Sequence, residues 1–142
     1  MSFDLKIKSG DIAIDSTGDV ALVTDNNKLK QDIIKIMLTK LGENKYHPQY
    51  GSKVGSLEIG HIPDKELLEL DLKVSADAAI RKLMSLQREQ SKTQYVSAGE
   101  TIAGIQNISV LQDDQDPRQY QITVSILTRK LTIIEETFSL QV

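Results

Sequence analysis

The sequence contains no cysteine and no tryptophan, and it has only two phenylalanines and three prolines among 142 residues. Without cysteine there can be no disulfide and no thiolate metal site, which fits a reducing compartment or a particle assembled inside one. Because aromatic residues make up only 4% of the chain, a hydrophobic core must be built mainly from leucine, isoleucine and valine.

Long apolar runs and a strong charge of one sign are also missing. No segment approaches the roughly 20 apolar residues of a membrane span, and the opening MSFDLKIKSGD lacks the apolar stretch of a signal peptide. Seventeen basic and twenty acidic residues are spread along the chain, which argues against the basic stripe that nucleic-acid binding requires. We therefore expect a soluble protein made in the cytoplasm, without nucleic-acid or membrane partners. Its length fits one domain over residues 1–142.

The first 42 residues predict a β-hairpin followed by a helix. Apolar residues alternate with small or polar ones over residues 4–24, and Asp15-Ser16-Thr17-Gly18 provides a turn. Residues 28–42 then carry apolar side chains at three- and four-residue steps. We expect Asn26 or Asn27 to cap this helix and Gly42 to end it.

The remainder predicts a second helix and a three-stranded sheet. Pro63 favours a helix start, and leucine and alanine recur at helical spacing to about Lys92. Residues 57–62 could form a short extended piece. Alternation returns from Ile105 in three segments separated by the turn residues 113–118 and 128–130. An N-terminal β-hairpin, two helices and a C-terminal three-stranded antiparallel sheet define an α+β fold.

Few residues point to catalysis or to a cofactor. Glu43, Asp64 and Glu66 are the acids in or near the first helix connection, and a glycosidase would need a carboxyl pair among such groups. His47 and His61 lack the i, i+4 spacing of a zinc-binding helix. Neither a serine elbow nor a phosphate loop is present. We expect no catalytic site, no metal and no cofactor.

The stretch GENKYHPQYGSKVGSL, residues 42–57, holds three of the eight glycines and two of the four tyrosines. Glycine allows close backbone approach, proline presets an extended segment, and tyrosine serves both cores and interfaces. The segment is therefore either a plain loop pinned by its tyrosines or a surface for another protein. If it is a surface, its candidate residues are Tyr46, Pro48, Tyr50, Gly51 and Ser52.

Three features together resemble a known family. They are GDIAIDSTGDVALV, the helix with Gln31-Asp32-Ile33-Ile34 and its closing Leu-Gly-Glu, and Pro48-Gln49-Tyr50-Gly51-Ser52-Lys53-Val54. In this order they are similar to the baseplate wedge and sheath-initiator proteins of contractile-tailed phages, a family whose members have also been labelled lysozyme-like. The resemblance covers most of residues 10–86.

The resemblance implies a structural, non-enzymatic part of the inner baseplate in the virion, with six copies in a ring. It implies a C-terminal sheet like the inner domain of the sheath subunit, which exchanges strands with sheath subunits. Further implied partners are other wedge proteins and the tail tube or hub. The family's Glu-Pro-Arg tripeptide is missing, and Asp116-Pro117-Arg118 lies in a predicted turn, so its role is not carried over.

A final strand that still alternates at the end of the sequence agrees with this role. An edge strand offers free N–H and C=O groups to a partner's strand, and alternate side chains would set the register. We expect these to be Phe138, Leu140 and Val142. Two alternatives remain: a peptidoglycan-cleaving tail lysozyme that uses Glu43 as its acid, and a cytosolic adaptor unrelated to phage.

Overall fold

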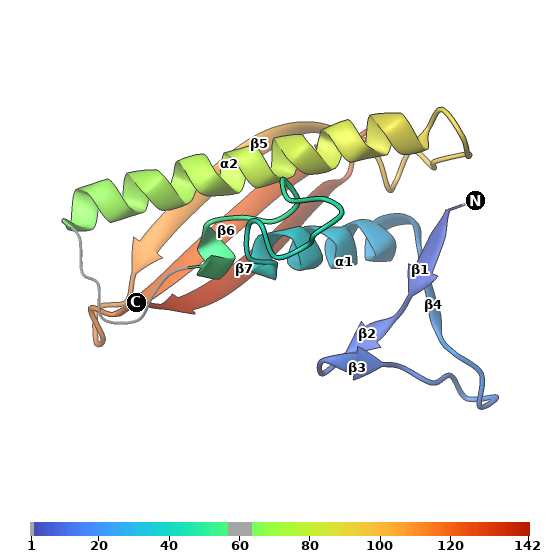
Figure 1. Cartoon of the computed structure of the whole chain (residues 1–142), viewed down its shortest axis with the longest axis horizontal. Coiled ribbons are helices and arrows are strands. Elements are labelled where there is room, and N and C mark those ends of the chain that lie inside the picture. The colour runs from blue at the N-terminus through green and yellow to red at the C-terminus, as the bar shows by residue number, and fades with distance from the viewer. Residues whose placement is uncertain (1, 57–63) are drawn as a thin grey trace.

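The computed structural model describes residues 2–56 and 64–142. It is an α+β structure in which N-terminal strands precede two helices and a three-stranded antiparallel sheet (Figure 1). The predicted fold class is thereby confirmed. The helices and the strands of the sheet are α1 (Asp25–Leu38), α2 (Lys65–Gln90), β5 (Ile102–Gln112), β6 (Gln119–Thr128) and β7 (Ile133–Gln141).

The C-terminal sheet has the order β5-β6-β7, and both helices lie against the same face of it (Figure 1). Helix α2 contacts β5 and β6, and α1 contacts β7. On β6 this inner face carries Ile122, Val124 and Ile126, which are fully buried. The other face carries mainly glutamine, serine and threonine along β6 and β7. Side-chain alternation therefore divides the sheet into a covered apolar face and an open polar face.

The core lies between this sheet and the two helices. Helix α1 contributes Leu29, Ile33, Ile36 and Met37, which recur at the spacing of one helix face. Helix α2 contributes a second set at the same kind of spacing, namely Leu68, Leu72, Ala76, Ala79, Ile80 and Leu83. Aliphatic residues dominate this core, as the composition predicted.

The boundaries of α1 differ from the prediction at both ends. The helix begins at Asp25 after Thr24, so Asn26 and Asn27 lie inside its first turn and do not cap it. It ends at Leu38 because Thr39, with extended backbone angles, directs both its N–H and its hydroxyl to the Lys35 carbonyl. The prediction that Gly42 ends the helix is therefore wrong by about one turn.

Helix α2 starts after Asp64, whose carboxylate accepts a hydrogen bond of 3.0 Å from the Glu66 N–H. Such a cap satisfies one of the free N–H groups of the first turn. The helix ends at Gln90, two residues before the predicted limit. The predicted helix start at Pro63, the extended piece at 57–62 and His61 lie outside the described residues.

The predicted N-terminal hairpin is present in a more divided form, which we call the arm (residues 3–24). Its strands are β1 (Phe3–Leu5), β2 (Ile7–Lys8), β3 (Asp11–Ile12) and β4 (Leu22–Thr24), paired as β1 with β4 and β2 with β3. The predicted turn is confirmed: the Gly18 N–H donates to the Asp15 carbonyl, and Gly18 has a φ of +89°. The arm projects from the rest of the molecule, which we call the body (Figure 1).

Candidate functional site

The outer edge of β7 has no strand paired to it among the described residues. The Val142 N–H donates to the Arg118 carbonyl at one end of the β6–β7 ladder, and the Thr128 N–H donates to the Thr132 carbonyl at the other. Because hydrogen-bonded pairs alternate along an antiparallel ladder, the even-numbered residues of β7 bond to β6. The N–H groups directed away from β6 are those of Ile133, Glu135, Thr137, Ser139 and Gln141.

The two borders of the sheet are not equivalent. Strand β7 pairs with β6 through nine residues without a register shift. Strand β5, at the other border, has shifts between Ile102 and Gly104 and between Ile105 and Asn107. Such irregularities bend a strand and interrupt the spacing of its free N–H and C=O groups. The β7 border is therefore the one with regular geometry for an added strand.

The side chains predicted to contact a partner at this end lie on the inner face of the sheet. Phe138 and Val142 are buried in the core, and Leu140 is partly buried against it. The β7 surface available to a partner therefore consists of main-chain groups, the outward side chains and Glu136, which is half-buried on the inner face. A role for the three side chains in setting a partner's register stays a prediction.

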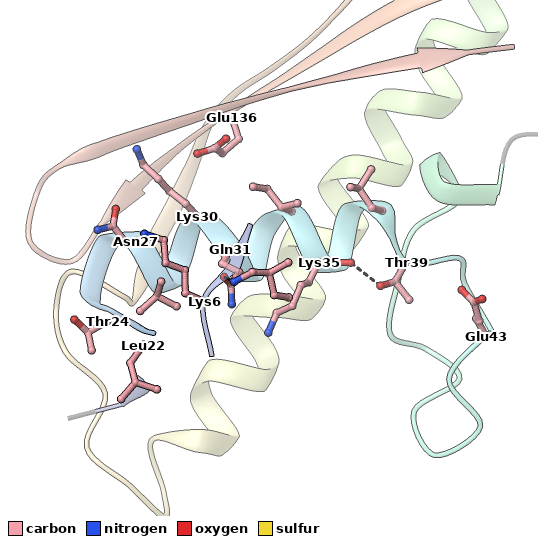
Figure 2. Close-up of a pocket in the computed structure, with 14 residues that line it drawn as sticks. Lys6, Leu22, Thr24, Asn27, Lys30, Gln31, Lys35, Thr39, Glu43 and Glu136 are labelled. Atoms are coloured by element: carbon pink, nitrogen blue, oxygen red, sulfur yellow. Dashed lines mark hydrogen bonds between the residues drawn. The ribbon is translucent and has the colours of Figure 1, made fainter. Parts of the chain in front are cut away.

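A groove of about 730 Å³ runs beside α1 and is bounded by the arm, the helix and β7 (Figure 2). Its apolar surface includes Ile7 and Leu22 from the arm and Ile34 and Leu38 from α1. Glu136 enters it from β7, on the side where Lys30 projects from the helix (Figure 2). We take this groove together with the β7 edge as the candidate functional site.

The side chain of Gln31 holds the arm against α1. Its amide nitrogen donates to the Leu5 carbonyl at 2.8 Å, and its amide oxygen accepts from the Ile7 N–H at 2.9 Å. A carboxamide thus makes the two hydrogen bonds that a neighbouring strand would make. Gln31 belongs to the helix motif that carried the family resemblance, but no sequence pattern indicated this contact.

An ion pair strengthens the same attachment. Lys35 Nζ lies 2.5 Å from Asp4 Oδ2 and 3.3 Å from Asp32 Oδ1. Burial raises the pKa of Asp4, but the hydrogen bond and charge of Lys35, with hydrogen bonds from Gln31 and the Leu5 N–H, outweigh it and lower that pKa. Burial likewise lowers the pKa of Lys35, and its bonds to Asp4 and Asp32 outweigh this and raise it.

The loop after α1 is fastened to the end of that helix. Gly51 has a φ of +125°, and a Cβ atom there would come within 2.6 Å of the Thr39 carbonyl oxygen. Ser52 is buried, and its hydroxyl donates to the Met37 carbonyl at 2.6 Å. Its N–H donates to the Thr39 carbonyl at 2.9 Å. Gly51 and Ser52 therefore close the loop against its own helix, and partner binding by them stays a prediction.

The other three candidate residues of the loop differ in how far they are exposed to solvent. Tyr50 is partly buried against the core, and this burial raises the pKa of its hydroxyl. Tyr46 is 91% exposed, and Pro48 is also exposed. Tyr50 thus pins the loop as the plain-loop reading predicted, whereas Tyr46 and Pro48 are the predicted residues that another protein could reach.

The arm exposes many apolar side chains, which sequence reasoning missed because alternation does not reveal what covers a strand. Cross-strand neighbours pair Leu5 with Leu22 and Ile7 with Ile12, and a bridge pairs Ile14 with Val20. Between 42% and 61% of each side chain is exposed for Phe3, Leu5, Ile7, Ile12, Ile14, Val20 and Leu22. Apolar surface gathered in this way marks an interaction site in many soluble proteins.

The remaining candidate residues are not gathered into a reaction centre in the part of the chain that the structure describes. Glu43 is exposed and lies at the end of the groove near Thr39 (Figure 2). His47 is exposed in the loop that follows. Within residues 2–56 and 64–142, no three histidine or acidic side chains are grouped to bind a metal. No helix in this part is long and apolar enough to cross a bilayer.

The sequence matches no family model and no curated protein. A solved structure is similar in fold: a protein of Geobacter sulfurreducens described as a "putative tail lysozyme". The two chains are 13% identical, with a TM-score of 0.51, and the match covers 81% of this chain and 88% of the other. At this identity the likeness establishes a shared fold, which extends over most of both chains.

Proposed function

We propose that this protein is a structural subunit of the inner baseplate of a contractile phage tail and that it starts sheath assembly by strand exchange. The observation that carries the proposal is the regular, unpaired edge of β7 beside an apolar groove. Strand addition to such an edge gives affinity through main-chain hydrogen bonds. The motifs that resemble wedge and sheath-initiator proteins support this assignment, and the fold shared with the protein described as a "putative tail lysozyme" supports a place in a phage tail.

In this proposal the sheath protein adds a strand at β7, and other wedge proteins bind the exposed part of the loop at Tyr46 and Pro48. Further contacts with the tail tube or hub would use the arm, whose apolar side chains are otherwise in water. The subunit would act in the virion as one of six in a ring, because linked copies multiply the effect of a modest contact.

A peptidoglycan-cleaving activity that uses Glu43 is the second candidate, and the description of the similar structure is the observation that favours it. Glycosidase acids are kept in apolar, water-poor surroundings, whereas Glu43 is exposed. Our proposal is therefore a non-enzymatic role. Clearing of a cell-wall suspension by the purified protein, lost in Glu43→Gln, would overturn this part of it.

The decisive test is Thr137→Pro in phage particles. Proline at this position removes an N–H that is directed away from β6, and proline is tolerated in an edge strand where the N–H faces solvent. Deleting the last six residues is a poorer test, because it would also remove Phe138 and Val142 from the core. Thr137→Val is the matched control, since it keeps the N–H and the β-branched shape.

We expect Thr137→Pro subunits to fold, as judged by circular dichroism, and to enter baseplates that carry no sheath in electron micrographs. Thr137→Val particles should build sheaths of normal length. Full sheaths on Thr137→Pro particles would contradict strand addition at β7.

A further inference from the structure

Helix α1 extends past the border of the sheet. One face of the helix supplies core residues, but Lys30, Ile34 and Leu38 follow one another at four-residue steps on a different face that lines the groove. Ile34 is 38% exposed and Leu38 is 55% exposed. Apolar side chains at this spacing normally lie beneath another element. The layer of helices is therefore wider than the sheet on the β7 side.

The groove has the dimensions of a strand site. Its lining residues on α1 run from Asn27 to Leu38, which at 1.5 Å per residue is about 16 Å. A β-strand rises about 3.3 Å per residue, so about five strand residues fit along it. A strand added to β7 would lie above Ile34 and Leu38, with Ile7 and Leu22 of the arm on its far side.

Glu136 favours a positively charged side chain at the neighbouring position of an added strand. It stands opposite Val124 in the β6–β7 register, so its side chain lies on the inner face between the positions of the buried Ile134 and Phe138. Within the described part of the chain its carboxylate has no hydrogen bond or ion pair. An inward-pointing charge on an edge strand discourages pairing with a wholly apolar strand, and oppositely charged cross-strand neighbours stabilise a pair.

We propose that the β7 edge and the α1 face together form an acceptor for one β-strand of defined chemistry. The inward side chains of that strand are apolar where they meet Ile34 and Leu38, and one of them is lysine or arginine next to Glu136. Its outward side chains are polar, like those of β7. This proposal rests on the proposed function, because it specifies which partner segment the β7 edge accepts.

The test supplies the strand within the same chain, so that its register is fixed. A threonine, an Asn-Gly turn and a strand of about ten residues are appended after Val142. The residues on either side of a two-residue hairpin turn hydrogen-bond to each other, and the Val142 N–H is bonded to Arg118, so one residue is needed between Val142 and the turn. The added strand has isoleucine or valine at inward positions, threonine at outward positions, and lysine opposite Glu136. Two control extensions replace that lysine by glutamate or all inward residues by serine.

Hydrogen exchange of the outward β7 amides, those of Ile133, Glu135, Thr137, Ser139 and Gln141, is the main measurement. We expect the lysine extension to slow their exchange at least about tenfold and to raise the unfolding midpoint by a few degrees. The glutamate extension should protect them less, and the serine extension should leave them as in the unextended chain. In a Glu136→Lys background the order of the lysine and glutamate extensions should reverse.

Unchanged exchange with the lysine extension would overturn the acceptor proposal. Equal protection by the lysine and glutamate extensions would overturn it as well, because the residue opposite Glu136 would then have no effect. These measurements use the isolated protein, so their result is separate from the assembly test. If the lysine strand is accepted but Thr137→Pro particles still build sheaths, the strand site stands and the proposed function fails.

Discussion

The arm and the body contain the same kind of alternating apolar sequence, yet they use it differently. In the body, Ile122 and Ile126 face the helices and are fully buried. In the arm, Ile12 and Ile14 alternate with neighbours that are small or polar, and Ile7 lies opposite Ile12 on the paired strand. These three residues remain 46% to 61% exposed. Alternation fixes which side chains share a face. Whether that face is covered depends on a second layer, which the body has and the described arm lacks.

The largest difference between the two regions should appear on truncating isoleucine. Ile122→Ala opens a cavity in the core and should lower the free energy of unfolding by about 3 kcal/mol. Ile14→Ala, in the arm, should lower it by less than about 0.5 kcal/mol, because this side chain is 61% exposed. Denaturant unfolding followed by circular dichroism measures both. Equal losses would mean that the arm is covered in solution, for example by a second copy of the chain.

A smaller difference should separate two glycines that both have positive φ. Gly51→Ala would bring a Cβ against the Thr39 carbonyl oxygen at 2.6 Å, so we expect a loss of about 2 kcal/mol from strain and displacement together. Gly18→Ala meets no atom within 4 Å and should cost about 1 kcal/mol, from backbone strain alone. Thermal unfolding of the two variants tests the order, and a larger loss for Gly18→Ala would refute the close packing of the loop.

The smallest effect should be a pH dependence confined to the arm. The pKa of Asp4 is lowered from 3.8 in the folded chain, so its ion pair stabilises the arm above that pH. This contribution is lost as the pH falls through the lowered value. The pKa of Lys35 is raised from 10.5, so its contribution is complete below pH 10.5 and disappears only as the pH rises through the raised value.

Methyl resonances of Ile7 and Ile12 in NMR spectra can follow this change. Between pH 4 and pH 10 they should stay constant, and in acid they should shift before those of Ile122 do. Asp4→Asn should abolish the acidic transition of the arm. An arm transition that persists in Asp4→Asn would assign it to another carboxyl group.

The sequence was sufficient for the elements that repeat a simple period. The core faces of α1 and α2, the three final strands and the turn at Gly18 all follow from spacing and turn chemistry. The start of α1 was mispredicted because Asp25 begins the helix with a φ of +53°, a conformation that its residue type does not reveal. Asparagine is a common cap, but here both candidates fall within the first turn.

The candidate site was harder to predict because its parts come from distant segments. The groove combines the arm, α1 and β7, and Gln31 reaches Leu5 and Ile7 across 26 and 24 residues of sequence. No local pattern encodes such contacts. The burial of Gly51 and Ser52 likewise depends on how the loop returns to the end of α1. The position of the final strand at an edge of the sheet agrees with its sequence, whereas the exposure of Tyr46 could not be predicted.

The register shifts in β5 have a consequence for stoichiometry. A sheet with two regular borders could keep recruiting strands on both sides and grow into a fibre. Here the β5 border has two register shifts and the β7 border has none, so under the proposed function strand addition would be confined to the β7 side. If that proposal holds, an assembly that starts on this subunit would extend from one side of it only.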